Sequence, residues 1–299
     1  MIAGLTQRWD RTTLPPARAL ARAWGPLVLI LTGAAATMVL PRIFGDPQSV
    51  DPDLWRLTGY FAAITAATVL LRSLRSMAPL AVALLTLTFP YSCWLWLLGY
   101  AGPAPSFAGE PYGLARNAYA GVAWLLVTFV MAAAFYYLTP KPRPKLRLWT
   151  RPRRGAILLA LSLTFLFLIV AFALPGPLIG REGVPLLSLG GSAAVAYGVA
   201  NATSAIAQEI QFRGVLLAAL ERQHSPWAAL IIQALIFGIA HIATQYQGPA
   251  DSLIPIVILL GVLWGWMTQR SNSVWPAAAV HVVAELFLVA TIVSGLYGK

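Results

Sequence analysis

Long apolar stretches recur from one end of the chain to the other, and no other feature restricts its fold as strongly. A helix that spans a bilayer needs about 20 mainly apolar residues. Runs of this kind lie at about 24–40, 55–71, 78–100, 117–138, 155–179, 186–220, 226–246, 252–269 and 274–296. Hydrophobic residues make up 59% of the 299 residues and charged ones 10%, against roughly 25% charged in a soluble domain. The sequence therefore predicts an all-α, polytopic transmembrane helix bundle of about eight or nine spans.

Basic residues indicate how these spans are oriented. The chain has 21 Lys and Arg against 10 Asp and Glu, and segment 139–154 holds seven basic residues and no acid. Because Lys and Arg accumulate in cytoplasmic loops, we expect the N-terminus and this loop to be cytoplasmic. The charge also favours contact with anionic lipid, and it predicts no nucleic-acid partner, since no aromatic-interleaved basic fold accompanies it.

The basic loop also divides the chain into regions. We expect a cytoplasmic tail at 1–23, a four-span membrane region at 24–138, the loop at 139–154 and a second membrane region at 155–299. The first membrane region has almost no charge inside its spans, whereas the second does. Chemistry is therefore expected in the second region.

A small group of ionisable residues lies inside the apolar runs of this second region. A charged side chain at mid-membrane costs at least a few kcal/mol, so such residues are usually functional or closely paired. From a rise of 1.5 Å per residue, Glu209, His241 and His281, on three separate helices, lie roughly 12–22 Å from the nearest loop. Similar depth on separate helices predicts one shared site. Its residues are Glu209, Arg213, His241, His281 and Glu285.

Helical spacing assigns these residues to faces. Glu209 with Arg213, and His281 with Glu285, are four residues apart, so each pair lies on one side of its helix. Gln208 points about 100° away from Glu209 and belongs to a separate polar stripe. Lipid cannot satisfy such a stripe, so it should face a water-filled cavity or other polar groups. The stripe consists of Asn201, Ser204, Gln208 and Gln211.

Three short motifs on these helices resemble those of a known family. They are QEIQFRG (208–214), FGIAH (237–241) and HVVAE (281–285). In order and spacing they are similar to the Glu-Glu-x-x-x-Arg, Phe-x-x-x-His and His-x-x-x-Asn motifs of the CAAX-protease and bacteriocin-processing family, which are glutamate-type intramembrane endopeptidases. The resemblance covers about residues 155–299 and implies a transmembrane helix bundle. In that family the first Glu and the His of the second motif activate water, and the third motif stabilises the oxyanion.

The sequence departs from this pattern at two positions. Gln208 stands where the family has its first Glu, and Glu285 stands where it often has Asn. An amide cannot act as a general base, so we interpret the departures as an exchange of roles. Glu285, with His241 or His281, would activate the water, and Gln208 would position that water or donate to the oxyanion. The alternative keeps Glu209 as the base, although a carboxylate paired with arginine is a weaker base and is held in place.

Other interpretations of the same residues remain open. Glu209 and Arg213 form a structural ion pair in one of them, and His281 with Glu285 a hydrogen-bonded pair between helices. A zinc site made by His241, His281 and Glu285 is a further alternative, although no His-Glu-x-x-His motif is present. Two other functions compete with catalysis. The loss of the first Glu favours an inactive membrane scaffold, and an ion-coupled transporter would be favoured by inverted repeats or broken helices, which the sequence does not show.

These observations predict an intramembrane endopeptidase that uses activated water and no cofactor. Its expected substrate is a membrane-anchored protein or peptide, cleaved at a C-terminal tail, at a sorting tail or during peptide maturation. The Ala-, Arg- and Pro-rich composition is typical of a bacterium with GC-rich DNA, so we expect the bacterial cytoplasmic (inner) membrane as its location.

Overall fold

The computed structural model describes residues 17–43, 50–99, 114–173, 191–242 and 254–286, and these are almost entirely helical. A short 3-10 helix, η1 (Arg72–Met77), precedes α3, and a π-helical segment, η3 (Ile210–Leu216), joins α6 to α7. The helices are α1 (Ala17–Ile43), α2 (Val50–Leu70), α3 (Ala78–Gly99), α4 (Leu114–Leu138), α5 (Arg154–Ala173), α6 (Gly191–Glu209), α7 (Leu217–Leu220), α8 (Pro226–Ile242), α9 (Ile254–Ser271) and α10 (Trp275–Ala284).

Each predicted apolar run coincides with helix in the described part of the chain. The long run at 186–220 contains α6, η3 and α7 in succession, and its first residues lie outside the described ones. By length and composition, two described stretches qualify as bilayer-spanning helices, Arg72–Trp94 and Ala118–Leu138. The all-helical architecture agrees with the predicted bundle, and the number of spans stays a prediction.

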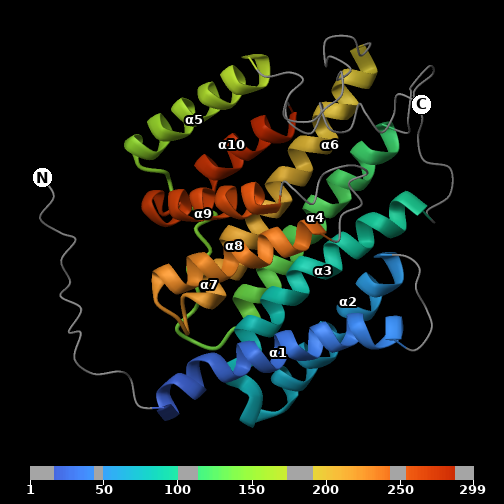
Figure 1. Ribbon diagram of the computed structural model, residues 1–299, viewed down its shortest axis with the longest axis vertical. Coiled ribbons are helices and arrows are strands. Elements are labelled where there is room, and N and C mark those ends of the chain that lie inside the picture. Colours follow the sequence, from blue (N-terminus) through green and yellow to red (C-terminus); the bar gives the residue numbers. More distant parts are fainter. Residues whose placement is uncertain (1–16, 44–49, 100–113, 174–190, 243–253, 287–299) are drawn as a thin grey trace, which may run out of the picture.

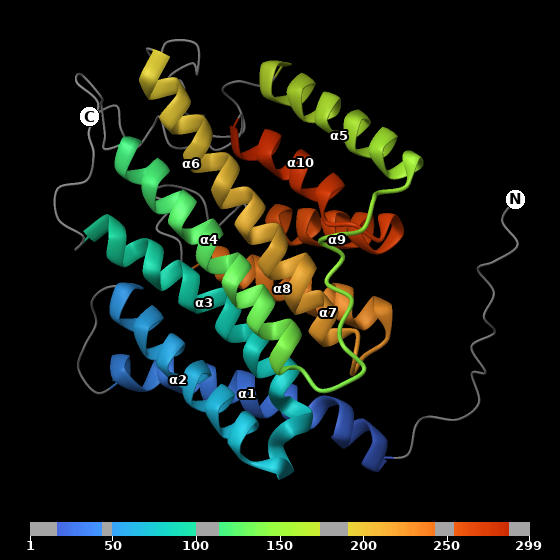
Figure 2. The same ribbon diagram turned by 180° about the vertical axis from the view of Figure 1, so that it is seen from behind.

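The helices form one bundle in which α4 and α6 run side by side through the middle (Figures 1 and 2). Helices α1, α2 and α3 pack at one end of the bundle, with α3 against α4. Helices α5, α9 and α10 lie at the other end, and α8 packs along α9. Segment η3 therefore lies in the interior, where it contacts α3, α4, α8 and α9.

Several helices carry an exposed apolar face. On α4 and α8 the exposed large apolar residues recur every four positions, which places them on one side of each helix. A helix of a soluble protein would carry polar residues on such a side, whereas a lipid-facing helix carries apolar ones. The residues are Val122, Leu126 and Val130 on α4, and Trp227, Ile231, Leu235 and Ile239 on α8.

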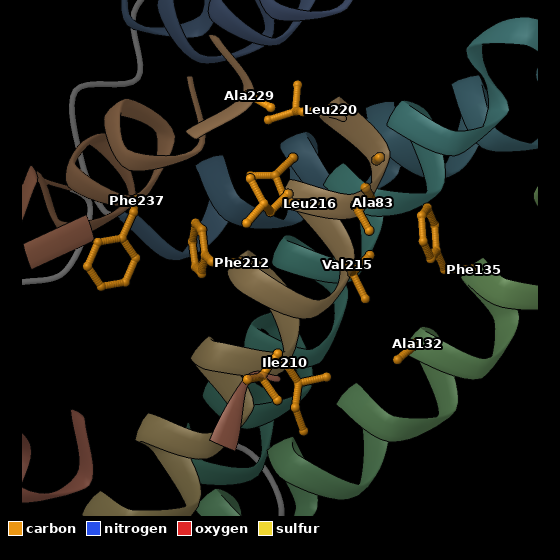
Figure 3. Close-up of a cluster of buried hydrophobic side chains, with 14 of the residues drawn as sticks. Ala83, Ala132, Phe135, Ile210, Phe212, Val215, Leu216, Leu220, Ala229 and Phe237 are labelled. Carbon is orange, nitrogen blue, oxygen red and sulfur yellow. The ribbon is translucent and has the colours of Figure 1, made fainter. Parts of the chain in front are cut away.

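The interior of the bundle is a cluster of apolar side chains around η3 (Figure 3). Phe212 lies edge-on to Phe237 of α8, with ring centroids 5.0 Å apart. Val215 and Leu216 are fully buried and belong to the same cluster as Ala83 of α3. This packing holds the π-helical segment against several helices at once.

Residues 139–153, which we call the strap, connect α4 to α5 and fold against the ends of other helices. Arg147 of the strap adopts a left-handed backbone conformation with φ of 55° and pairs with Glu221, 2.9 Å away. The indole Nε1 of Trp275 donates a hydrogen bond to the carbonyl oxygen of Leu148 at 2.7 Å, and Leu148 itself is buried. The predicted basic loop is therefore a packed part of the fold, and its cytoplasmic position stays a prediction.

Close packing between α8 and α9 depends on small residues. A Cβ atom at Gly261 would lie 3.1 Å from Ala234 Cα and 3.3 Å from Phe237 Cδ1, so the two backbones approach closely here. Small residues four positions apart, such as Gly261 and Gly265, allow this approach between membrane helices. A side chain at position 261 therefore requires the neighbouring atoms of α8 to shift, by a few tenths of an ångström for a methyl group and by more for a larger residue.

Gly261→Leu is expected to lower the free energy of unfolding by about 1–3 kcal/mol because overpacking forces the backbones apart. Thermal unfolding of the purified protein in detergent measures the effect. Gly198→Leu on α6 is the matched control, since no heavy atom lies within 4 Å of its added Cβ. Equal midpoints for the two variants would contradict close packing at Gly261.

Candidate active site

The first candidate motif lies at the start of η3. The N–H of Leu217 donates to the carbonyl oxygen of Phe212, five residues earlier, which is the hydrogen-bond pattern of a π-helix. Such turns are frequent at functional sites. Here the wider turn directs side chains to different helices: Glu209 toward α10, Gln211 toward α4 and Phe212 toward α8.

Glu209 is fully buried, and one of its carboxylate oxygens contacts two other side chains. Its Oε1 lies 3.0 Å from Arg213 Nη1 and 2.8 Å from His281 Nδ1 of α10. The Arg213 contact is the pair that helical spacing predicts, whereas the His281 contact joins two helices that are distant in sequence. Contacts from η3 and α10 therefore fix the position of the Glu209 carboxylate.

The imidazole of His281 lies between two carboxylates. Its Nδ1 faces Glu209, and its Nε2 lies 3.4 Å from Glu285 Oε1, which is a looser contact on its own helix. The ring stacks on Trp264 of α9, with centroids 4.1 Å apart and an interplanar angle of 26°. Both ring nitrogens and one ring face of His281 are therefore positioned by neighbours.

Arg213 is enclosed by aromatic rings. Its guanidinium carbon lies 4.1 Å from the centroid of Phe237 and 5.4 Å from that of Trp264, distances at which the ring faces attract a cation. Within the described residues, its Nε and Nη2 have no hydrogen-bond acceptor. Its charge is therefore balanced chiefly by Glu209, and losing that partner would leave a cation buried among apolar groups.

His241 reaches the same region from α8. Its Nδ1 lies 2.7 Å from the carbonyl oxygen of Phe237, and donation from this nitrogen leaves the lone pair on Nε2. The ring contacts Phe237 edge-on, at 4.5 Å between centroids. Electrostatic interactions link the imidazole to Glu285 and His281. His241 is thus a neighbour of the Glu209–His281–Glu285 chain.

Gln208 points elsewhere, as its helical position predicts. Its Nε2 donates to Ser204 Oγ at 3.1 Å, and no described contact joins it to Glu209 or His281. The other stripe residues are satisfied within the bundle: Gln211 donates to Thr128 of α4, and Asn201 to the carbonyl oxygen of Tyr197. The predicted stripe therefore meets polar groups of the protein itself.

Two aromatic residues of the site were not predicted from the sequence. Phe237 occurs in the second motif, but no role was assigned to it. Trp264 received no role from the sequence, yet it is 2% exposed and stacks on His281. Its place well inside an apolar run, away from the ends, was the available signal.

A metal ion in a protein usually needs three or more ligand side chains close together. No three His, Cys, Asp or Glu side chains among them form a group that could hold a metal ion. The zinc ligands considered above include His281, and each of its nitrogens faces a carboxylate instead. The site as described is a hydrogen-bonded chain of carboxylates and imidazole.

These features define a class of protein: a bundle of apolar helices with an internal site that combines carboxylate and imidazole groups. Residues 190–287 match the family model of the Type II CAAX prenyl endopeptidase Rce1-like family, which confirms the resemblance predicted from the three motifs. This is a family of membrane-embedded proteases, and the apolar helices are consistent with an integral membrane protein. Neither a curated protein nor a solved structure matches the chain.

Proposed function

We propose that the chain is an intramembrane endopeptidase that hydrolyses a peptide bond with a water molecule activated at Glu285. The position of His281 carries this proposal. Its ring lies between carboxylates from two helices, 2.8 Å from Glu209 and 3.4 Å from Glu285, and it is buried in the bundle. A histidine held only for structure would need one carboxylate partner. His281 has two, and the longer of the two contacts holds Glu285 less firmly than Glu209.

Accessibility separates the two carboxylates. The Glu285 side chain is 12% exposed, whereas that of Glu209 is 0% exposed and its Oε1 contacts both Arg213 and His281. We infer that Glu285 is the carboxylate that meets the attacking water, and that Glu209 orients His281. This division of roles supports the exchange inferred from the sequence and assigns Glu209 a positioning role.

The reaction would proceed by direct attack of water. Glu285 accepts a proton from the water, assisted by the lone pair of His241 Nε2, and the water oxygen bonds to the carbonyl carbon. The proton then passes to the leaving nitrogen as the peptide bond breaks. Gln208 would donate to the oxyanion after its amide turns away from Ser204, a contribution of about 10²–10³ in rate. No covalent enzyme intermediate and no metal cofactor are needed.

We propose a membrane-anchored protein or peptide as the substrate, in a bacterial inner membrane. Members of the matched family are described as prenyl endopeptidases. Because the composition indicates a bacterial origin, cleavage of a C-terminal or sorting tail, or peptide maturation, is the proposed activity here.

One observation favours a second function, that of an inactive family member acting as a scaffold. Gln208 replaces the first Glu of the family motif, and its amide is engaged by Ser204. A scaffold would keep binding its partner after either Glu285→Gln or His241→Ala. The proposed peptidase would lose cleavage in both variants.

The test compares the membrane proteome of the native host expressing the wild type, Glu285→Gln, Glu209→Gln or His241→Ala. We expect the same terminal peptide to remain uncleaved in the Glu285 and His241 variants while both proteins accumulate normally. The Glu209 variant shows whether that residue acts beyond positioning His281. Unchanged termini in all variants, with normal accumulation, would reject the peptidase and favour the scaffold.

A further inference from the structure

A cavity of about 650 Å³ lies between α4 and the strap, away from the candidate active site. One wall is formed by the end of α4, with Phe129, Ala133, Tyr136 and Tyr137, and the other by strap residues 145–150. This volume is within the range of small-molecule pockets, about 300–1,000 Å³. The cavity can therefore accept a ligand of substantial size.

The lining changes in character along the cavity. Toward the middle of α4 it consists of Phe129, Ala132 and Ala133, whereas Lys145 and Thr150 line the strap side. Tyr137 is 70% exposed, as expected for an aromatic residue at a membrane interface. One side of the cavity is therefore apolar and continues onto the lipid-facing side of α4. The other side is a polar rim with positive charge.

Among the described residues, one basic side chain at this rim has no acidic partner. None of the described residues that line the cavity is acidic. Arg147 is engaged by Glu221 and Arg143 lies over the rings of Tyr136 and Tyr137, whereas Lys145 is exposed at the cavity. Lys145 is therefore the cation positioned to meet a ligand.

We propose that this cavity binds a phospholipid with an anionic headgroup. The headgroup phosphate would contact Lys145, and the upper acyl chain would lie along Phe129 and Ala133. The Thr150 hydroxyl donates to the carbonyl oxygen of Asn272 and is therefore not a donor to the phosphate. Anionic lipids concentrate in the cytoplasmic leaflet, where the positive-inside rule places the strap. This binding site is independent of the proposed peptidase activity.

The test is a lipid titration of the purified full-length chain in detergent, followed by native mass spectrometry. The probes are phosphatidylglycerol, phosphatidylcholine and soluble glycerol phosphate. Detergent removes the surface potential of a leaflet, so only direct contacts remain. We expect one phosphatidylglycerol to bind in preference to phosphatidylcholine, and glycerol phosphate alone not to bind, because the apolar wall contributes.

Two variants locate the site. Lys145→Ala should weaken phosphatidylglycerol binding up to about fivefold, which corresponds to about 1 kcal/mol, the upper end of the range for a direct contact between exposed charges. Arg151→Ala is the matched control, since Arg151 is an exposed basic strap residue that does not line the cavity. Ala133→Phe should abolish binding by filling the cavity without changing the charge.

Several results would overturn the proposal. Equal weakening by Lys145→Ala and Arg151→Ala would indicate general surface attraction. Equal binding of phosphatidylcholine would remove the role of headgroup charge, and binding of glycerol phosphate would identify a free phosphate site. If Ala133→Phe fails to fold by thermal unfolding, the Lys145 and Arg151 comparison decides alone.

Discussion

Glu285→Gln is expected to lower the rate of substrate cleavage by about 10²–10⁴-fold, the usual contribution of a general base. The amide keeps the size of the side chain and can still contact His281, so the fold should persist. It cannot accept the proton of the attacking water. Cleavage of the substrate found in the host proteome, measured with purified protein in detergent or liposomes, gives the rate.

Glu221→Gln supplies the matched control for this experiment. It makes the same chemical change at a carboxylate that pairs with Arg147 of the strap, outside the candidate site. We expect its cleavage rate to remain close to that of the wild type. If Glu285→Gln cleaves as fast as Glu221→Gln, Glu285 is not the base, and Glu209 becomes the carboxylate to examine.

Arg213→Met is expected to destabilise the protein by about 3–5 kcal/mol, the range found when one partner of a buried ion pair is removed. Glu209 would keep its charge in an apolar interior with only His281 as a partner. The methionine replaces part of the volume of Arg213 beside Phe237, so the effect is mainly electrostatic. The amount of protein in the membrane and its thermal midpoint in detergent measure the loss.

The double variant Arg213→Met with Glu209→Gln separates charge from packing. Because it removes both charges, it should recover much of the stability that Arg213→Met loses. If the double variant is as unstable as the single one, the contacts of Arg213 with Phe237 and Trp264 matter more than its ion pair. If Arg213→Met is as stable as the wild type, the pair has no structural role.

Much of the helical framework could be predicted from the sequence because apolar runs long enough for membrane helices leave few alternatives. The pairs Glu209–Arg213 and His281–Glu285 were also predictable, since residues four apart share a helix face. The 2.8 Å contact between Glu209 and His281 was not, because it depends on how α10 packs against η3. Local spacing contains no information on contacts between helices.

The strap and the aromatic residues show the same limit. Its basic charge predicted a cytoplasmic loop, but charge says nothing of Leu148, which is buried next to Gly214 of η3. Trp264 stacks on His281 because α9 presents it inward. Its place inside an apolar run indicates that it is not at the interface, but it does not indicate which residue it contacts. Packing determines these contacts, and composition does not reveal packing.

The π-helical turn at 210–216 depends on the number of residues that it contains. Its i→i+5 hydrogen bonds enclose one residue more than the bonds of an α-helix, so removing one residue would leave an ordinary α-helical turn. Gln211 and Phe212 would then no longer be directed to α4 and α8 as they are now. Substitutions in this segment act on single contacts, whereas a change in its length alters several contacts between helices at once.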